Sequence, residues 1–175
     1  MAGGTLRSTL TPAQQQAMDR IVAAVPGLLH QLFGDALLAV VLFGSVARGT
    51  PHTCSDSDWL VVLRERSPQP REDHERVQQL NHLLGPLLTD AASVGLLTEP
   101  QVHLRSAAEA EMGGPLFLDL CHEGVPVHDS EGWADDFLHR YRLRLAQQGS
   151  ERVPWGDGWY WRLTPEVRPP AEVWF

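Results

Sequence analysis

The chain has 175 residues, of which 43% are hydrophobic, enough for one domain, with or without an extension, to bury a substantial core. Its net charge of −8 and pI near 5.4 argue against a generally basic nucleic-acid binder. No stretch approaches the roughly 20 apolar residues of a membrane span, and the first residues lack the apolar core of a signal peptide, so we expect a cytoplasmic protein. Cys54 and Cys121 match no usual metal-ligand spacing and are predicted to be free thiols.

The first third of the chain predicts helices followed by a buried strand. The segment from Thr11 has the capping residue, the proline and the glutamine that are typical of a helix start, and apolar residues then follow at helical spacing. Pro26 is expected to break or kink this helix, so that a second short helix runs to Phe33. Residues 37–43 are continuously apolar and predict a buried strand.

The rest of the chain alternates predicted strands and helices. We expect, in order, a strand at 58–63, a polar loop at 64–71, an amphipathic helix from Glu72 to Leu84, strands near 93–98 and 101–105, a short helix at 115–123, and a turn into an edge strand at 124–129. A helix from Trp133 to Gln147 and a tryptophan-rich β-hairpin around 156–158 are expected to follow.

Two aspartates open the second predicted strand. Asp56 and Asp58 bracket Ser57, and residues two apart on a strand point to the same face. Carboxylates that close repel each other unless a cation lies between them, and Mg²⁺ is bound by one or two carboxylates together with substrate phosphates. The pair is therefore a candidate site for Mg²⁺, or for Mn²⁺ in its place. The simpler interpretation is the start of a strand with two solvated aspartates.

Gly44 and Ser45 follow the first predicted strand directly, and Val46 to Arg48 can open a helix. A glycine lets the backbone approach a phosphate closely, and the free N–H groups of a helix start favour an anion. The Ser45 hydroxyl can bind a phosphate oxygen. An ordinary strand-to-helix turn is the alternative, and the segment is not a P-loop, because the chain contains no lysine.

Residues 43–58 resemble the signature of the DNA polymerase β-like nucleotidyltransferase superfamily. A Gly-Ser pair, a gap of ten residues, Asp-x-Asp and an apolar strand follow one another in both. The fuller pattern, Phe-Gly-Ser-x-Ala-Arg-Gly with Ser-Asp-x-Asp, is similar to the branch of minimal nucleotidyltransferases, which includes relatives of the aminoglycoside nucleotidyltransferases.

The resemblance implies a role for each matching residue. Gly44 and Ser45 would hold the β- and γ-phosphates of a nucleoside triphosphate, and Asp56 and Asp58 would bind the Mg²⁺ ions. Arg48 also belongs to the phosphate-binding segment, where it is implied to support or pack the site rather than to act as a catalyst.

The family usually has a third carboxylate on a later strand, which completes the metal site and assists deprotonation of the acceptor hydroxyl. Here the usual position falls on Gln101 or His103, neither of which is acidic. Glu99 is the nearest acid and is our candidate for the third carboxylate, although Pro100 beside it disturbs the strand. His103 is an alternative base, and a partly buried strand histidine is the simpler interpretation.

The resemblance implies an α/β (α+β) fold, with a nucleotidyltransferase domain over 1–130, in which helices flank a mixed β-sheet, and a C-terminal extension of a helix and a hairpin over 131–175. It implies Mg²⁺-dependent transfer of a nucleoside monophosphate from a triphosphate such as ATP to a hydroxyl of a protein, an RNA or a small molecule. Minimal family members often pair with a small helical HEPN-type protein, so a toxin–antitoxin partner of that type is expected. Because no acid occupies the usual third position, a catalytically weak or inactive, antitoxin-like nucleotide-binding module is the alternative.

Two features of the extension leave several interpretations open. Arg140 and Arg144 share one face of the predicted helix, which could meet phosphate, RNA or an acidic partner, although a solvated face is the simpler interpretation. Trp155, Trp159 and Trp161 gather in the hairpin. They could stack a nucleobase or anchor a partner protein, and by default they supply the core of a small appendage.

Overall fold

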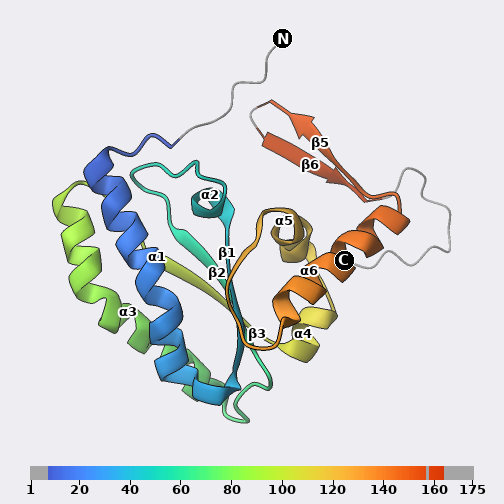
Figure 1. Cartoon of the computed structure of the whole chain (residues 1–175), viewed down its shortest axis with the longest axis horizontal. Helices are drawn as coiled ribbons and strands as arrows, with labels where there is room; N and C mark the ends of the chain where they lie inside the picture. The colour runs from blue at the N-terminus through green and yellow to red at the C-terminus, as the bar shows by residue number, and fades with distance from the viewer. Residues whose placement is uncertain (1–7, 157, 164–175) are drawn as a thin grey trace.

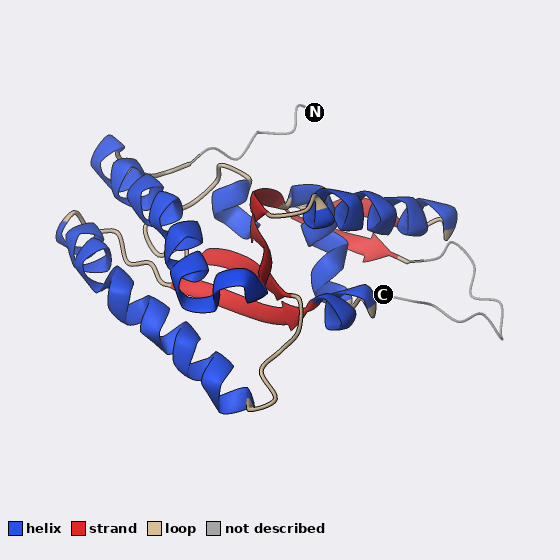
Figure 2. Cartoon of the chain, turned by 60° about the horizontal axis from the view of Figure 1, so that its bottom comes forward, coloured by secondary structure: helices blue, strands red, loops and turns tan. Residues whose placement is uncertain are grey.

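The computed structural model describes residues 8–156 and 158–163. The expected start of the domain at 1–7, the hairpin residue Asp157 and the end of the extension at 164–175 lie outside the described residues. A four-stranded sheet lies between two layers of helices, and a two-stranded hairpin follows at the C-terminal end (Figures 1 and 2). This arrangement confirms the predicted α/β class.

The main sheet is mixed and has the strand order β3-β2-β1-β4. Its strands are β1 (Leu37–Phe43), β2 (Ser57–Leu63), β3 (Pro100–Ser106) and β4 (Val125–Asp129). β1 runs antiparallel to β2 and β4, whereas β2 and β3 are parallel. The end of β1 therefore lies at the same edge of the sheet as the starts of β2 and β3.

Helices cover both faces of the sheet, so both faces are apolar. The helices are α1 (Pro12–Phe33), α2 (Gly44–Ala47), α3 (Pro70–Ser93), α4 (Ala107–Glu111), α5 (Pro115–Glu123) and α6 (Trp133–Gln147), with a 3₁₀ turn at Gly34–Ala36. α1 and α3 pack on the face that carries Trp59 and Val61, whereas α4, α5 and α6 pack on the face that carries Leu60 and Val62 (Figure 1). A strand buried on both faces reads as a continuous apolar run, which is how the sequence predicted β1 and β2.

Two internal prolines do not end their helices. α1 runs as one helix through Pro26, so the second short helix that was predicted up to Phe33 is not separate, and α3 runs through Pro86, well past its predicted end. An interior proline costs about 3 kcal/mol. Burial of Val25 and Leu29 on either side of Pro26 offsets this cost, because a fully buried aliphatic side chain contributes roughly 1.5–3 kcal/mol.

The strand predicted near 93–98 was also wrong. α3 continues to Ser93, and a connecting segment then leads into β3. Leu96 of that segment is fully buried in the core while Leu97 is exposed, which produced the misleading alternation. The predicted strand at 101–105 is confirmed as β3, the predicted helix at 115–123 as α5 and the helix over Trp133–Gln147 as α6.

The C-terminal hairpin is present as predicted, with strands β5 (Glu151–Trp155) and β6 (Gly158–Arg162). Its tryptophans differ in environment. Trp161 packs against the apolar cluster between the sheet and the helices α4, α5 and α6, whereas Trp155 is 75% exposed and supplies no core. On α6, Arg140 forms ion pairs with Glu111 and Asp136. The expected basic face of α6 is therefore partly neutralised.

Among the described residues, Cys54 and Cys121 are free thiols, as predicted. Burial raises the pKa of the Cys121 thiol to about 12. The helices in the described part of the chain include none with the length and apolar character required to cross a bilayer.

Candidate active site

The sheet register brings the predicted site residues to one edge. Phe43, the last residue of β1, pairs with Asp58 of β2, and Asp58 pairs in turn with Gln101 of β3. Gly44 follows Phe43 directly, and Asp56 lies just before β2. The Gly44–Ser45 turn and the carboxylate pair, separated by ten residues in sequence, are therefore neighbours in space.

Gly44 touches Asp58. Gly44 begins α2 with a φ of +74°, and a Cβ atom added to it would lie 2.2 Å from Asp58 Oδ2. Any other residue would have to displace the carboxylate as well as adopt a left-handed backbone. The turn that begins at Gly44 is closed by two backbone hydrogen bonds. Arg48 N–H donates to the Gly44 carbonyl at 3.1 Å, and Thr50 N–H donates to the Ser45 carbonyl at 2.9 Å.

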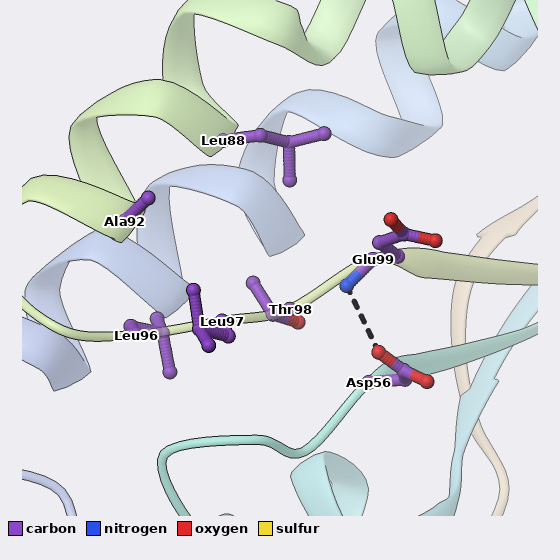
Figure 3. A pocket seen from close by; sticks show the side chains of 7 residues that line it. All are labelled: Asp56, Leu88, Ala92, Leu96, Leu97, Thr98 and Glu99. Atoms are coloured by element: carbon purple, nitrogen blue, oxygen red, sulfur yellow. Dashed lines mark hydrogen bonds between the residues drawn. The ribbon is translucent and has the colours of Figure 1, made fainter.

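Asp56 is held by the start of β3. Its Oδ1 accepts a hydrogen bond from the Glu99 backbone N–H at 3.0 Å, and its Oδ2 accepts one from Gln101 Nε2 at 3.5 Å. Figure 3 shows the Glu99 carboxylate pointing away from Asp56, so the contact of Glu99 with Asp56 is through its backbone. Over residues 8–156 and 158–163, no group of three or more His, Cys, Asp or Glu side chains is placed to hold a metal ion. Sequence reasoning missed the orienting role of Gln101, since a glutamine at a carboxylate position signals only a departure from the family.

Asp58 and His103 influence each other on the face that α4, α5 and α6 cover. Burial raises the pKa of Asp58, and the Asp56 charge adds to this effect while His103 and Arg48 oppose it. Burial lowers the pKa of His103, although Asp58 favours its protonated form. The imidazole lies 5.5 Å from the Phe43 ring. His103 is thus a half-buried strand histidine that stays uncharged at neutral pH.

A cavity of about 350 Å³ opens beside Asp56 (Figure 3). Its walls come from α3 and from the segment before β3: Leu88, Ala92, Leu96, Leu97, Thr98 and Glu99. The Thr98 hydroxyl is buried and has no hydrogen-bond partner in the described part of the chain. The cavity combines aliphatic side chains with the carboxylates of Asp56 and Glu99.

Arg48 lies just after α2, where its guanidinium forms an ion pair with Glu123 at the end of α5. This contact agrees with the supporting role that the resemblance implies. Nothing in the sequence signalled Glu123, since a single acid at the end of a helix is common and its partner lies 75 residues away.

Comparisons with known proteins show similarity over the part of the chain that holds this site. The family model described as "Nucleotidyltransferase domain" matches residues 27–109. A Methanocaldococcus jannaschii protein named "Putative protein adenylyltransferase MJ1305" is 47% identical over 47 residues, which are 27% of this chain and 31% of that protein. The match therefore spans about a third of the length of that relative.

Two solved structures also share similarity with the chain. One is a mutant of the toxin–antitoxin complex MntA–HpeT, with a TM-score of 0.46 and 18% identity over 73% of this chain and 91% of that chain. The other is spectinomycin adenyltransferase AAD(9) from Enterococcus faecialis with ATP and spectinomycin, with a TM-score of 0.46 and 11% identity over 74% of this chain and 66% of that chain. The family match contains β1, β2, β3 and both halves of the predicted motif, so residues 27–109 match the nucleotidyltransferase domain family.

Proposed function

We propose that this protein is a Mg²⁺-dependent nucleotidyltransferase that transfers a nucleoside monophosphate from a triphosphate to a hydroxyl acceptor. The observation that carries the proposal is the contact between Gly44 and the Asp58 carboxylate. A triphosphate bound by its β- and γ-phosphates at Gly44 and Ser45 would have its α-phosphate next to the carboxylate pair. Phosphoryl transfer depends on this kind of positioning and on charge stabilisation.

The donor set fits Mg²⁺. Asp56 and Asp58 offer the carboxylate oxygens that this ion prefers, and substrate phosphates and water can complete its coordination. Burial and the Asp56 charge both disfavour the ionised form of Asp58, so a cation here would offset an existing cost. Mn²⁺ would use the same oxygens. A bound ion would neutralise charge on the transferring phosphoryl group and on the leaving pyrophosphate.

The chain's own residues supply the remaining roles. Gln101 and the Glu99 backbone hold Asp56 in place. The acceptor oxygen attacks the α-phosphorus, the bond to pyrophosphate breaks, and the acceptor proton passes to a base. We assign that base to His103, because its imidazole is uncharged at neutral pH and lies on the same face as Asp58. Glu99 is the second candidate, since its side chain lines the cavity beside Asp56.

The order of the strands supports a direction of attack. The attacking and leaving oxygens lie roughly in line in phosphoryl transfer. With pyrophosphate at the end of β1 and the carboxylates on β2, the acceptor would approach from the side of β3, the strand that carries His103. The acidic side chains of Asp56 and Glu99 lie at the start of this strand, so this side favours a neutral or cationic hydroxyl compound over a phosphate-rich RNA.

We infer that the donor is ATP and that the acceptor is a protein. The name of the M. jannaschii relative, "Putative protein adenylyltransferase", supports both points. A small helical HEPN-type protein in a toxin–antitoxin pair is the partner that we propose first, in keeping with the resemblance to minimal nucleotidyltransferases.

A thermal-shift titration with the four ribonucleoside triphosphates, with and without Mg²⁺, tests the proposal. A ligand that binds only the folded state raises the melting temperature. We expect a Mg²⁺-dependent shift with ATP that is lost in Asp58→Asn and kept in Asp35→Asn, since Asp35 is exposed at the opposite end of β1. Absence of a shift with every triphosphate would contradict the proposal.

A third acid, Glu99, lies beside Asp56 but turns its carboxylate away from it (Figure 3), and this favours a second candidate function, a nucleotide-binding module without turnover. The two functions differ in pyrophosphate release. Mg·ATP binding without pyrophosphate release, in the presence of the helical partner, would support the inactive module, whereas steady release would rule it out.

A further inference from the structure

Glu123 connects the phosphate-binding segment to the C-terminal hairpin. It is the last residue of α5, its side chain is only 5% exposed, and its carboxylate forms ion pairs with both Arg48 and Arg152. Arg48 follows α2 and Arg152 lies on β5. Glu123 and Arg152 are both outside the segment that matches the nucleotidyltransferase family.

The hairpin side of this connection is anchored to α5. The Arg152 guanidinium stacks on the Trp159 ring, 3.4 Å from its centroid, and the Arg48 guanidinium lies 5.2 Å from the same centroid. Trp159 Nε1 donates a hydrogen bond to Asp119 Oδ1 at 2.8 Å, as Trp161 Nε1 does. Arg152 is therefore held on two sides, by an indole and by a carboxylate.

The other side of the connection reaches the nucleotide site. α2 is a single turn of four residues without a side-chain cap, and a helix that short is not stable by itself. Its conformation depends on tertiary contacts. The Arg48 backbone N–H closes the turn onto the Gly44 carbonyl, so fixing the Arg48 side chain also fixes the turn that carries Gly44 and Ser45.

We propose that Glu123 is a positioning residue for the nucleotide site. It holds Arg48 on one side and the hairpin residue Arg152 on the other, and so keeps the phosphate-binding turn in its binding conformation. The C-terminal hairpin thereby becomes a working part of the site. This inference rests on the proposed function, because it assumes that the turn binds phosphates.

A double-mutant cycle on the full chain tests the coupling. The variants are Glu123→Gln, Arg48→Met and their combination, and the readout is the Kd of Mg·ATP measured by calorimetry. Residues that orient metal ligands typically contribute about 10–100-fold in affinity, and by analogy we expect Glu123→Gln to raise Kd about tenfold. If Glu123 acts through Arg48, the combined variant binds no more weakly than Arg48→Met alone.

Two further variants separate positioning from folding. Arg152→Met removes the support from the hairpin while leaving the pair between Glu123 and Arg48, and we expect a smaller rise in Kd. Glu151→Gln removes an exposed ion pair with Arg162 inside the same hairpin and should leave Kd unchanged. In turnover, Glu123→Gln should raise KM for ATP more than it lowers kcat, which a general loss of folded protein would not do.

An unchanged or lower Kd in Glu123→Gln would overturn the inference, and a lower value would mean that Glu123 competes with phosphate for Arg48. Additive effects in the cycle would overturn it as well. If the Glu123→Gln variant does not fold, the Arg152→Met variant tests the inference in its place. An unchanged Kd of Mg·ATP in Arg152→Met would overturn the role of the hairpin. Failure of the unaltered protein to bind Mg·ATP would overturn the proposed function itself, which distinguishes the two outcomes.

Discussion

Asp58 Oδ2 lies only 2.2 Å from the position that a Cβ atom on Gly44 would occupy. The contact joins the two halves of the motif, because Gly44 ends the β1 side and Asp58 begins the β2 side. It explains in physical terms why a glycine is required at this point of the chain. It also makes the site sensitive to a single added methyl group.

Gly44→Ala is therefore expected to damage the site beyond its effect on the backbone. The added Cβ must displace the Asp58 carboxylate, and a misplacement of about 1 Å can cost roughly 100-fold in rate. The measurement is pyrophosphate release with Mg·ATP, together with the melting temperature.

Gly49→Ala is the matched control for this variant. Gly49 has nearly the same φ, +72°, but its Cβ would meet nothing within 4 Å. Both variants should lose about 1–2 kcal/mol of stability from the left-handed backbone, and only Gly44→Ala should lose transfer. Equal activity of the two variants would show that the contact with Asp58 is unimportant.

Asp58 is also predicted to lower the stability of the folded protein at neutral pH. Burial raises its pKa above the ordinary value of 3.8, so the folded state holds this proton more tightly than the unfolded state. Stability from this group is therefore present at low pH and is lost as pH rises from about 3.8 through the raised pKa. Asp58→Asn should increase the free energy of unfolding at pH 7 in the absence of divalent cations.

Urea denaturation at several pH values checks this prediction. The gain in Asp58→Asn should shrink as pH falls through the raised pKa and should be absent below 3.8, where both states of the original protein are protonated. Adding Mg²⁺ should stabilise the original protein and leave the variant unaffected. A variant that is less stable at pH 7 without Mg²⁺ would show that the Asp58 charge is better compensated than its burial indicates.

Much of the site was predictable from sequence because its parts are local. Gly44, Ser45, Asp56 and Asp58 lie on two consecutive strands, and the apolar runs identified those strands. The contribution of β3 to the site was harder to predict, because Glu99 is the nearest acid in the sequence but contacts Asp56 through its backbone. Parallel pairing sets Gln101 opposite Asp58, and that register depends on how β3 returns beside β2.

The long helices show the same limit. Pro26 lies where local rules break a helix, yet α1 continues because residues on both sides of it are buried against the sheet and α3. The helix propensity of single residues predicts helix ends poorly where burial of apolar side chains contributes several kcal/mol to stability. The link between Glu123 and Arg48 is likewise tertiary and could not be read from either residue.

Glu99→Gln is expected to leave transfer within a few-fold of the original rate. The carboxylate points away from Asp56, and the backbone N–H that holds Asp56 is unchanged by this substitution (Figure 3). Asp56→Asn, in contrast, removes a metal ligand and should cost more than the 10–100-fold that is typical for a residue behind a ligand. Comparable losses in the two variants would identify Glu99 as the third carboxylate.

His103 is expected to set the acid limb of the pH–rate profile. Its pKa lies below 6.5 because of burial, so the imidazole is ready to accept a proton at neutral pH and loses this ability as pH falls through the lowered value. His103→Gln should reduce kcat by about 100-fold, the lower end of a general-base contribution. It should also remove the part of that limb that belongs to His103 and leave the fall that protonation of Asp58 produces. Binding of Mg·ATP should change little, because His103 contacts neither phosphate nor metal in this scheme. A variant that keeps the original acid limb would exclude His103 as the base and return the role to Glu99 or to water.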